Sequence, residues 1–512
     1  GGGLLWKFAR NAPAPATVAI AAGASATNAA SSVVDDRKSI AVLPFANMSS
    51  DKDNAYFSDG VSEEILDVLA RSPGLHVAAF TSSSAFKGKG MTVPAIAHQL
   101  NVRMVLEGSV RRAGDRVRVT AQLIDAKTGF QVWSQTYDRK LKDIFAIQDD
   151  IAKAIGNELE VKLAGTLPAG KNSVGTNNLK AYDLYLRGNA LWHTRQEANI
   201  WQAVDLLNQA ITTDTEFAQA YASLAMVYAD VGDYSSRIPI AESLSRATDF
   251  AEQALALNPR LPEAYAALGI VAGNEFRRAT AVKLLSRAIA LQPSFANAYM
   301  ARGRVLMANG DLAGAMASLD QALSLDPRSL IGAANKTLVL QAMGRLAEAK
   351  VACKQALAIQ PTFVPCLGNT AIVDLELGDY PEAQSLFERQ AVVQNPSARA
   401  QGRELVAALS GHADRHALAL RYATFAVDSL VHQGSGNVIW GAEMPVVLML
   451  LGEHQLALDY LERLAAFAGG SADDAVMMPA LDPIRCQPRF VAIVKKLRTT
   501  DPYHNKVCAK KN

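Results

Sequence analysis

The sequence carries little net charge and few aromatic residues. It has 51 lysines and arginines against 49 aspartates and glutamates, which leaves a formal net charge of +2. A chain with this balance lacks the global basic field that drives binding to nucleic acid, so we expect no nucleic-acid partner for this region. Aromatic residues make up only 7%, but 50% of the 512 residues are hydrophobic, enough to bury the cores of about two to four domains.

Motifs of the common catalytic sites are also missing. The sequence has no phosphate-binding loop, no dinucleotide-binding glycine pattern after a strand and no G-x-S-x-G elbow. The stretch FKGKGMT (86–92) has two glycines and two lysines without phosphate-loop spacing, which indicates a mobile loop. His412 and His416 are spaced to share one helix face, but no third metal ligand lies nearby in the sequence. We therefore predict a non-catalytic chain without a cofactor or a metal.

The first 38 residues contain no apolar run long enough to span a membrane. Residues 11–34 are uncharged, but their prolines and polar residues are typical of a flexible linker rather than of a spanning helix of ~20 residues. Residues 1–10 (GGGLLWKFAR) place Trp beside Lys and Arg, a composition typical of the point where a membrane helix leaves the bilayer. A cloning remnant is the alternative. We interpret residues 1–38 as a membrane-exit segment and a linker, and we expect a further segment upstream of Gly1.

What the sequence has in abundance is a repeat with a period of 34 residues. Prolines, alanines and glycines return at this interval, as in Pro259, Pro293, Pro327 and Pro361; in Ala247, Ala281, Ala315, Ala349 and Ala383; in Ala254, Ala288, Ala322 and Ala356; and in Gly310, Gly344 and Gly378. Such a period, with small residues at fixed points and a proline at the end, is typical of a solenoid of helix pairs.

One unit of the repeat shows why these residue types recur. Two apolar stripes at helical spacing are made by Tyr265, Leu268, Gly269 and Ala272, and by Ala281, Leu285, Ala288 and Leu291. Gly269 and Ala288 let the two helices approach closely, and Pro293 ends the second helix because it cannot donate a backbone hydrogen bond. This pattern resembles the tetratricopeptide repeat (TPR) family. The regular units are 262–295, 296–329, 330–363 and 364–397.

Looser copies extend the repeat on both sides. We expect about seven units in a TPR superhelical solenoid over 179–470, with an insertion of ten residues between Gly232 and Ala247. Beyond residue 397 the phase is lost, and only 441–464 clearly predicts another helix pair. Residues 471–512 are predicted to form a C-terminal cap with a polar end, as an exposed end of a solenoid requires.

An α/β domain precedes the repeats. The patterns predict a strand at 39–45, a helix begun by Val61, a strand at 75–80, a helix at 94–101, three antiparallel strands and a last helix over Ile144–Leu159. This order, with KSIAVLPFANMSSDKDNAYFSDGVSEEIL and VLEGSVRRAGDRVRVTAQLIDAKTGFQVWSQTYDR, resembles the TolB-like N-terminal domain over 39–165. We expect it to form its own core, separated from the repeats by a Gly/Asn/Pro linker at 166–178.

The pairing of these two domains implies a function. Proteins with this arrangement are bacterial signalling proteins, in which both parts usually follow a cytoplasmic output domain and one transmembrane helix. The output is commonly a CadC-like DNA-binding domain and less often a class III nucleotide cyclase. The resemblance therefore implies a periplasmic region tethered to the inner membrane that senses or binds a protein or peptide. The alternatives are the regulatory half of an adenylate or guanylate cyclase and a free-standing envelope scaffold; self-association also stays open.

In TPR proteins the partner lies in a groove lined mainly by the first helix of each repeat. By repeat position, the groove residues implied here are Asn274, Asn297, Arg304, Asn335, Gln341, Asn369 and Glu376. Asn335 and Asn369 share the position at which some TPR proteins bind the backbone or the carboxylate of a peptide, although the full carboxylate clamp is absent. The equally weighted alternative is that these asparagines bond neighbouring repeats.

The four cysteines lie in two regions of the sequence, two in the regular repeats and two near the C-terminus. Cys353 lies at a core position of its repeat and is expected to behave as a small apolar residue, with Cys366 in the next repeat. Cys486 and Cys508 flank the predicted closing helix and a turn that brings the chain back on itself. If this region lies outside the cytoplasm, these two are expected to form a disulfide. Two free thiols in a cytosolic protein are the alternative.

Overall fold

The computed structural model describes residues 38–161, 163, 173–235, 237–393, 397–432, 443–467 and 471–509. The predictions for residues 1–37 and for 166–172 of the linker lie outside these described residues.

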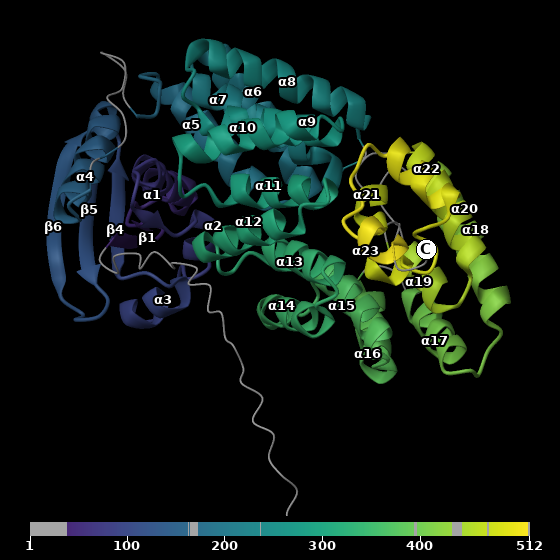
Figure 1. Cartoon of the computed structure of the whole chain (residues 1–512). Coiled ribbons are helices and arrows are strands. Elements are labelled where there is room, and N and C mark those ends of the chain that lie inside the picture. The colour runs from purple at the N-terminus through teal and green to yellow at the C-terminus, as the bar shows by residue number, and fades with distance from the viewer. Residues whose placement is uncertain are drawn as a thin grey trace, which may run out of the picture. The chain divides into compact units, whose positions relative to one another are not determined.

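The N-terminal part is a mixed sheet with helices (Figure 1). Its strands are β1 (Ser39–Val42), β2 (Ala46–Asn47), β3 (His76–Val77), β4 (Met104–Ala113), β5 (Arg116–Asp125) and β6 (Gln131–Lys140). Its helices are α1 (Ala55–Ala70), α2 (Phe80–Ser84), α3 (Val93–Leu100) and α4 (Ile144–Glu158). Every predicted element is present in the predicted order, but β2 and α2 were not predicted, β1 ends at Val42 and not at residue 45, and α1 begins six residues before Val61. The predicted strand at 75–80 is shorter because Phe80 already begins α2.

The sheet order is β3-β1-β4-β5-β6, with β1 parallel to both of its neighbours and β4, β5 and β6 an antiparallel meander. β1 is buried along its whole length, as its continuous apolar sequence predicts for a strand covered on both faces. β5 alternates as predicted: Val117, Val119, Ala121 and Leu123 are fully buried, and the residues between them are polar. This buried face packs under α1 and α4.

Helix pairs make up the rest of the described chain. The first helices of the pairs are α5 (Leu179–Trp192), α7 (Ala218–Asp230), α9 (Pro262–Asn274), α11 (Ala296–Ala308), α13 (Leu330–Ala342), α15 (Val364–Leu377), α17 (Ser397–Leu409) and α19 (Met444–Leu450). The second helices are α6 (Glu197–Thr213), α8 (Ile240–Leu257), α10 (Arg278–Leu291), α12 (Leu312–Leu325), α14 (Leu346–Ile359), α16 (Tyr380–Val393), α18 (Arg415–His432) and α20 (His454–Phe467). Each of the four regular units forms one helix pair. α17 and α18 form a further pair, which the sequence did not predict because the 34-residue spacing is lost after residue 397.

The extra residues predicted in the second unit lie in two places. The turn between α7 and α8 is lengthened to Val231–Pro239, and α8 has 18 residues where α10 has 14. The small residues of the stripes are fully buried, including Ala281, Ala288 and Ala315. A Cβ on Gly269 would lie 2.6 Å from Leu285 Cγ, so glycine here allows the close approach of α9 to α10.

The prediction of two separate cores is wrong. One hydrophobic cluster runs from the sheet through α1 and α4 into α5 to α9, and the residues from Asp36 onward form one compact unit. Tyr182 of α5 is 1% exposed and packs edge-on against Phe57 of α1 and Phe145 of α4, with ring centroids 6.5 and 4.9 Å apart. The two parts share one core because α1 is buried on two sides. One side packs on the sheet, and the other packs on α5.

The C-terminal residues do more than cap the last helix pair. This C-terminal segment (471–509) contains α21 (Ser471–Val476), η5 (Pro479–Leu481), α22 (Pro488–Lys496) and α23 (His504–Cys508). α22 packs against α20, as a cap does, but α21 and the residues after α22 reach back to the repeats between 262 and 363 (Figure 1, yellow). The prediction of a purely terminal cap is therefore incomplete.

Candidate functional site

The seven predicted groove residues do not share one environment. Asn274, Asn297 and Arg304 are exposed, whereas Asn335, Gln341 and Asn369 are 8%, 2% and 7% exposed. Glu376 is half-buried. Repeat position alone does not separate the exposed residues from the buried ones, because all seven occupy first-helix positions of similar repeats.

Three of these residues bond neighbouring repeats instead of facing a groove. Asn369 donates from Nδ2 to the backbone carbonyl of Ala334, 3.3 Å away, and Gln341 donates from Nε2 to Glu376 Oε1. Burial raises the pKa of Glu376 to about 7. Their assignment to an exposed binding surface is therefore wrong, since each polar group satisfies a partner inside the stack of helices. Asn274 donates only to Ile270 of its own helix.

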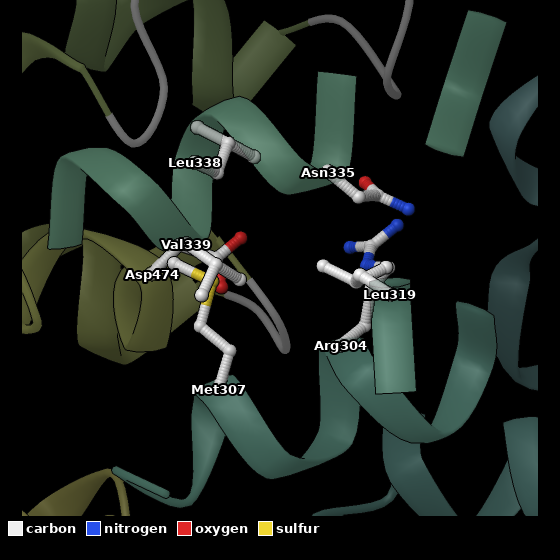
Figure 2. Close-up of a pocket in the computed structure, with 7 residues that line it drawn as sticks. All are labelled: Arg304, Met307, Leu319, Asn335, Leu338, Val339 and Asp474. Atoms are coloured by element: carbon white, nitrogen blue, oxygen red, sulfur yellow. The ribbon is translucent and has the colours of Figure 1, made fainter. Parts of the chain in front are cut away.

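Arg304 and Asn335 lie together at a small pocket (Figure 2). The pocket encloses ≈ 210 Å³ of space including open solvent, and its walls are Arg304, Met307, Leu319, Asn335, Leu338, Val339 and Asp474. Arg304 and Met307 come from α11, Asn335, Leu338 and Val339 from α13, and Asp474 from the C-terminal segment. Two adjacent repeats and the end of the chain thus build one site.

The polar groups of the pocket leave hydrogen-bonding capacity unused. Figure 2 shows the guanidinium of Arg304 and the amide of Asn335 directed toward one another, and the Asn335 Nδ2 is buried without an acceptor. Both groups donate hydrogen bonds, so an oxygen acceptor placed between them would satisfy both. Burial raises the pKa of Asp474, and the charges of Arg304 and Arg278 oppose that rise. The pocket can therefore hold one carbonyl or carboxylate oxygen.

Sequence reasoning missed the C-terminal contribution to this region. Arg278, 6% exposed, forms an ion pair with Asp473, whose side chain is 3% exposed. Burial raises the pKa of Asp473 to about 6, against the opposing effect of Arg278. The paired acids Asp473 and Asp474 next to a helix end were a local signal, but nothing local showed that this helix lies against α9 to α13.

A second polar cluster lies where α1 meets the repeats. Glu63, Glu64 and Asp67 of α1 face Tyr185 of α5 and Glu263 of α9. Burial, followed by mutual repulsion, raises the pKa of Glu63 and of Asp67 to about 8 and that of Glu64 in the same direction. Burial also lowers the pKa of His193, which lies 3.6 Å from Glu63, to about 4. The raised pKa values favour the neutral form of Glu63, Glu64 and Asp67, and the lowered one favours neutral His193.

Both cysteine pairs lie at disulfide geometry. Cys486 and Cys508 are joined with Cα atoms 5.5 Å apart, and Cys353 and Cys366 with Cα atoms 5.4 Å apart. Cys353 is fully buried as predicted, but the expectation that it acts only as a small apolar residue is wrong. Its helix, α14, packs against α15 of the next repeat, which brings the two sulfur atoms together.

No metal or membrane-spanning feature is found in the described part of the chain. Its His, Cys, Asp and Glu side chains include no group of three placed to hold a metal ion. His416 instead lies 3.1 Å from Glu453. Within the same residues, no helix combines the length and the apolar character needed to cross a membrane.

Comparison with known proteins agrees with the helix pairs. The family model of the tetratricopeptide repeat matches residues 296–329, which span α11 and α12. The chain contains tetratricopeptide repeats. PilF of Pseudomonas aeruginosa is 18% identical, with a TM-score of 0.33 over 42% of this chain and 91% of PilF. YrrB, described as a TPR protein with an unusual peptide-binding site, is 19% identical, with a TM-score of 0.28 over 37% of this chain and 92% of YrrB.

One curated relative has a longer chain. A protein of Rhizobium meliloti (strain 1021) named "Putative adenylate cyclase 3" is 37% identical over 236 residues, which are 46% of this chain and 40% of that protein. This chain therefore matches less than half of the relative's length. Among solved structures, the C-terminal domain of LpoB from Salmonella enterica is 18% identical, with a TM-score of 0.18 over 20% of this chain and 82% of that domain.

Proposed function

We propose that this chain is the protein-interaction region of a bacterial signalling protein, and that it binds an extended peptide segment of a partner at the repeats. The observation that carries the proposal is the pocket between two adjacent repeats, where Arg304 and the unpaired amide of Asn335 present donors to one oxygen acceptor. A peptide backbone carbonyl, or a carboxylate at a peptide end or side chain, has this chemistry.

A peptide selection tests the proposal. The immobilised full chain would be used to select from a phage-displayed library of random peptides, and synthetic copies of the enriched peptides would be titrated by fluorescence anisotropy. Arg304→Glu is expected to weaken binding at least tenfold, equivalent to about 1.4 kcal/mol, because it removes a donor and repels an acceptor. The matched control is Asn297→Ala, an exposed residue of the same helix outside the pocket.

Two results would contradict this function. If the selection yields no peptide with measurable affinity, the repeats do not bind free extended segments. If peptides bind but Arg304→Glu and Asn335→Ala leave their affinity unchanged, binding occurs elsewhere and the Asn335 amide is not a ligand contact.

A second candidate function is the regulatory half of a nucleotide cyclase. The relative named as an adenylate cyclase favours it, since the match covers 46% of this chain. Under either proposal the N-terminal sheet is a TolB-like domain, and the region lies in the periplasm, tethered to the inner membrane by an upstream helix. The reading frame upstream of Gly1 discriminates between them: a cyclase domain there, with cyclic nucleotide formed by the full-length protein, supports the second candidate, and a DNA-binding domain there rejects it.

A further inference from the structure

One short stretch of the C-terminal segment crosses three consecutive repeats. We call it the return strand (497–503); it carries no helix and lies between α22 and α23. The backbone carbonyls of Leu497 and Arg498 accept hydrogen bonds from Arg278 Nη1 at 3.1 and 2.7 Å. Arg278 belongs to the first of the three repeats. The return strand therefore begins with its backbone, not its side chains, bound to a buried arginine.

The next two contacts follow one repeat at a time. The Thr499 hydroxyl donates to the carbonyl of Ala308 at the end of α11, and the Tyr503 hydroxyl donates to the carbonyl of Ala342 at the end of α13, 2.5 Å away. Ala308 and Ala342 are 34 residues apart, so they hold the same position in successive repeats. Four residues of extended chain reach at most about 14 Å. Packed helices lie about 8–10 Å apart. The stretch from Thr499 to Tyr503 is therefore long enough to reach from one repeat to the next.

The repeats are shaped to receive this chain. Gly310 has a φ of +81°, and a Cβ there would lie 2.3 Å from the backbone oxygen of Thr500. A larger residue at 310 would therefore both strain the turn and displace the return strand. The bound stretch thus shares two features with a peptide ligand: hydrogen-bonded contacts to three successive repeats and a close backbone approach.

The return strand is held at its far end by a disulfide that reductants can reach. Cys486 and Cys508 are both partly exposed, whereas Cys353 and Cys366 are fully buried. Cys508 Sγ lies 3.6 Å from His504 Nδ1, a neighbour able to take up the thiol proton once the bond is broken. Access and thiolate character govern thiol–disulfide exchange, so the outer disulfide is the more readily reduced of the two.

We propose that the ends of α9, α11 and α13, with the turns that follow them, form a peptide-binding surface. The return strand is its resident ligand, and reduction of Cys486–Cys508 releases that strand so that an extended segment of a partner with the same contacts can bind. This surface is distinct from the Arg304 and Asn335 pocket, and its control by reduction goes beyond the peptide binding proposed above. The reductant is a dithiol. One of its thiolates attacks a sulfur of the pair to give a mixed disulfide, and its second thiol then displaces the protein sulfur, leaving two protein thiols and an oxidised dithiol.

The first experiment measures release in the full chain without any partner. Mild dithiol treatment followed by thiol mass mapping is expected to label Cys486 and Cys508 before Cys353 and Cys366. Hydrogen–deuterium exchange at the amides of the return strand (497–503) is expected to rise at least tenfold in the reduced protein and in the Cys486→Ser/Cys508→Ser variant. Unchanged exchange at these sites, or earlier labelling of the buried pair, would overturn the proposal.

The second experiment measures binding in trans. A fluorescent peptide with the sequence of residues 495–505, which contains no cysteine, is expected to bind the Cys486→Ser/Cys508→Ser variant and to bind oxidised wild type at least tenfold more weakly. Adding Thr499→Val and Tyr503→Phe to the peptide is expected to abolish binding. Release without binding in trans would reject the peptide-binding surface. If no library peptide depends on Arg304, the exchange measurement and the binding of the 495–505 peptide still give their own results. The two proposals can therefore fail independently.

Discussion

The two edges of the repeats are covered by different ends of the chain and by different chemistry. One edge, formed by the turns after the second helices, meets the sheet: Ser294 contacts Ala70, Leu75 and Val77, and Asp326 accepts hydrogen bonds from Thr81 and Ser82. Behind these contacts lies the continuous apolar cluster. At the other edge, hydrogen bonds join the return strand to Arg278, Ala308 and Ala342, and the buried Arg278–Asp473 ion pair joins α21 to the same repeats. The Cys486–Cys508 disulfide ties the C-terminal segment to itself.

This difference separates a permanent junction from a releasable one. A buried aromatic side chain contributes several kcal/mol, and its loss is felt in any condition. A single hydrogen bond contributes only about 0.5–1.5 kcal/mol net, because water replaces the partner when the contact opens. The sheet should therefore stay attached to the repeats whenever the chain is folded. The return strand is also anchored, because Leu497 lies in an apolar cluster shared with Met307 and Leu312 and Asp501 pairs with the buried Arg485, so we expect its release to depend on breaking Cys486–Cys508. The predictions below test this difference, from the largest expected effect to the smallest.

Tyr182→Ala should have the largest effect. It removes a fully buried ring packed on Phe57 and Phe145 and leaves the Gln148 Nε2, which donates to the Tyr182 hydroxyl, without its partner. We expect a loss of about 3–5 kcal/mol and one shared unfolding transition for the sheet and the first repeats, measured by calorimetry. Val351→Ala, at a residue 64% exposed, is the control and should change little. Separate transitions for the two parts would contradict the shared core.

Arg278→Met should come next, because it leaves Asp473 buried without its cation. Breaking a buried ion pair typically costs about 3–5 kcal/mol. Here the loss in the free energy of unfolding should be near the lower limit. It should be smaller at pH 5 than at pH 8. Burial already raises the pKa of Asp473 to about 6, and a protonated acid needs no cation. Urea denaturation at the two pH values measures it. The control is Arg277→Met, at an exposed neighbouring residue that pairs with Glu275. A loss of stability that does not depend on pH would argue against Asp473 as the cause.

The junction at α1 should weaken as the pH rises. The folded-state pKa of Glu63 and of Asp67 is raised to about 8 from ordinary values of 4.5 and 3.8, so the folded chain binds more protons than the unfolded chain between these limits. The stability that the cluster contributes is then greatest below about pH 4 and falls as the pH rises toward 8, by an amount on the order of 2 kcal/mol. Glu63→Gln with Asp67→Asn should flatten this slope in thermal unfolding. Asp138→Asn, on the exposed sheet face, should leave it unchanged.

Local patterns predicted the elements well and their contacts poorly. The 34-residue period located α9 to α16, and the alternation in 116–123 gave β5 its buried face, because both signals repeat within a few residues. The lost phase after 397 hid α17 and α18, whose pairing depends on neighbours rather than on spacing. The return of the C-terminal segment to Arg278 joins residues 195 positions or more apart, and no local pattern reports such a contact.

The site shows the same limit at single residues. Arg304 and Asn335 were found by repeat position, which the regular period makes dependable, and the pocket brings them together. Asp474 was missed because it comes from outside the repeats. The Cys353–Cys366 pair was within reach of the sequence: the second helix of one repeat packs on the first helix of the next, so cysteines at repeat positions 24 and 3 face each other.

The smallest effect should separate two asparagines that share one repeat position. Asn369 donates to the Ala334 carbonyl across the repeat boundary, so Asn369→Ala removes a buried hydrogen bond between two repeats and should cost about 1 kcal/mol. The Asn335 Nδ2 has no acceptor, so Asn335→Ala removes an unsatisfied donor and should change the free energy of unfolding by less than about 0.5 kcal/mol. Parallel urea titrations measure both variants. Equal losses would mean that Asn335 also bonds within the stack, and its amide would then no longer be available to a ligand.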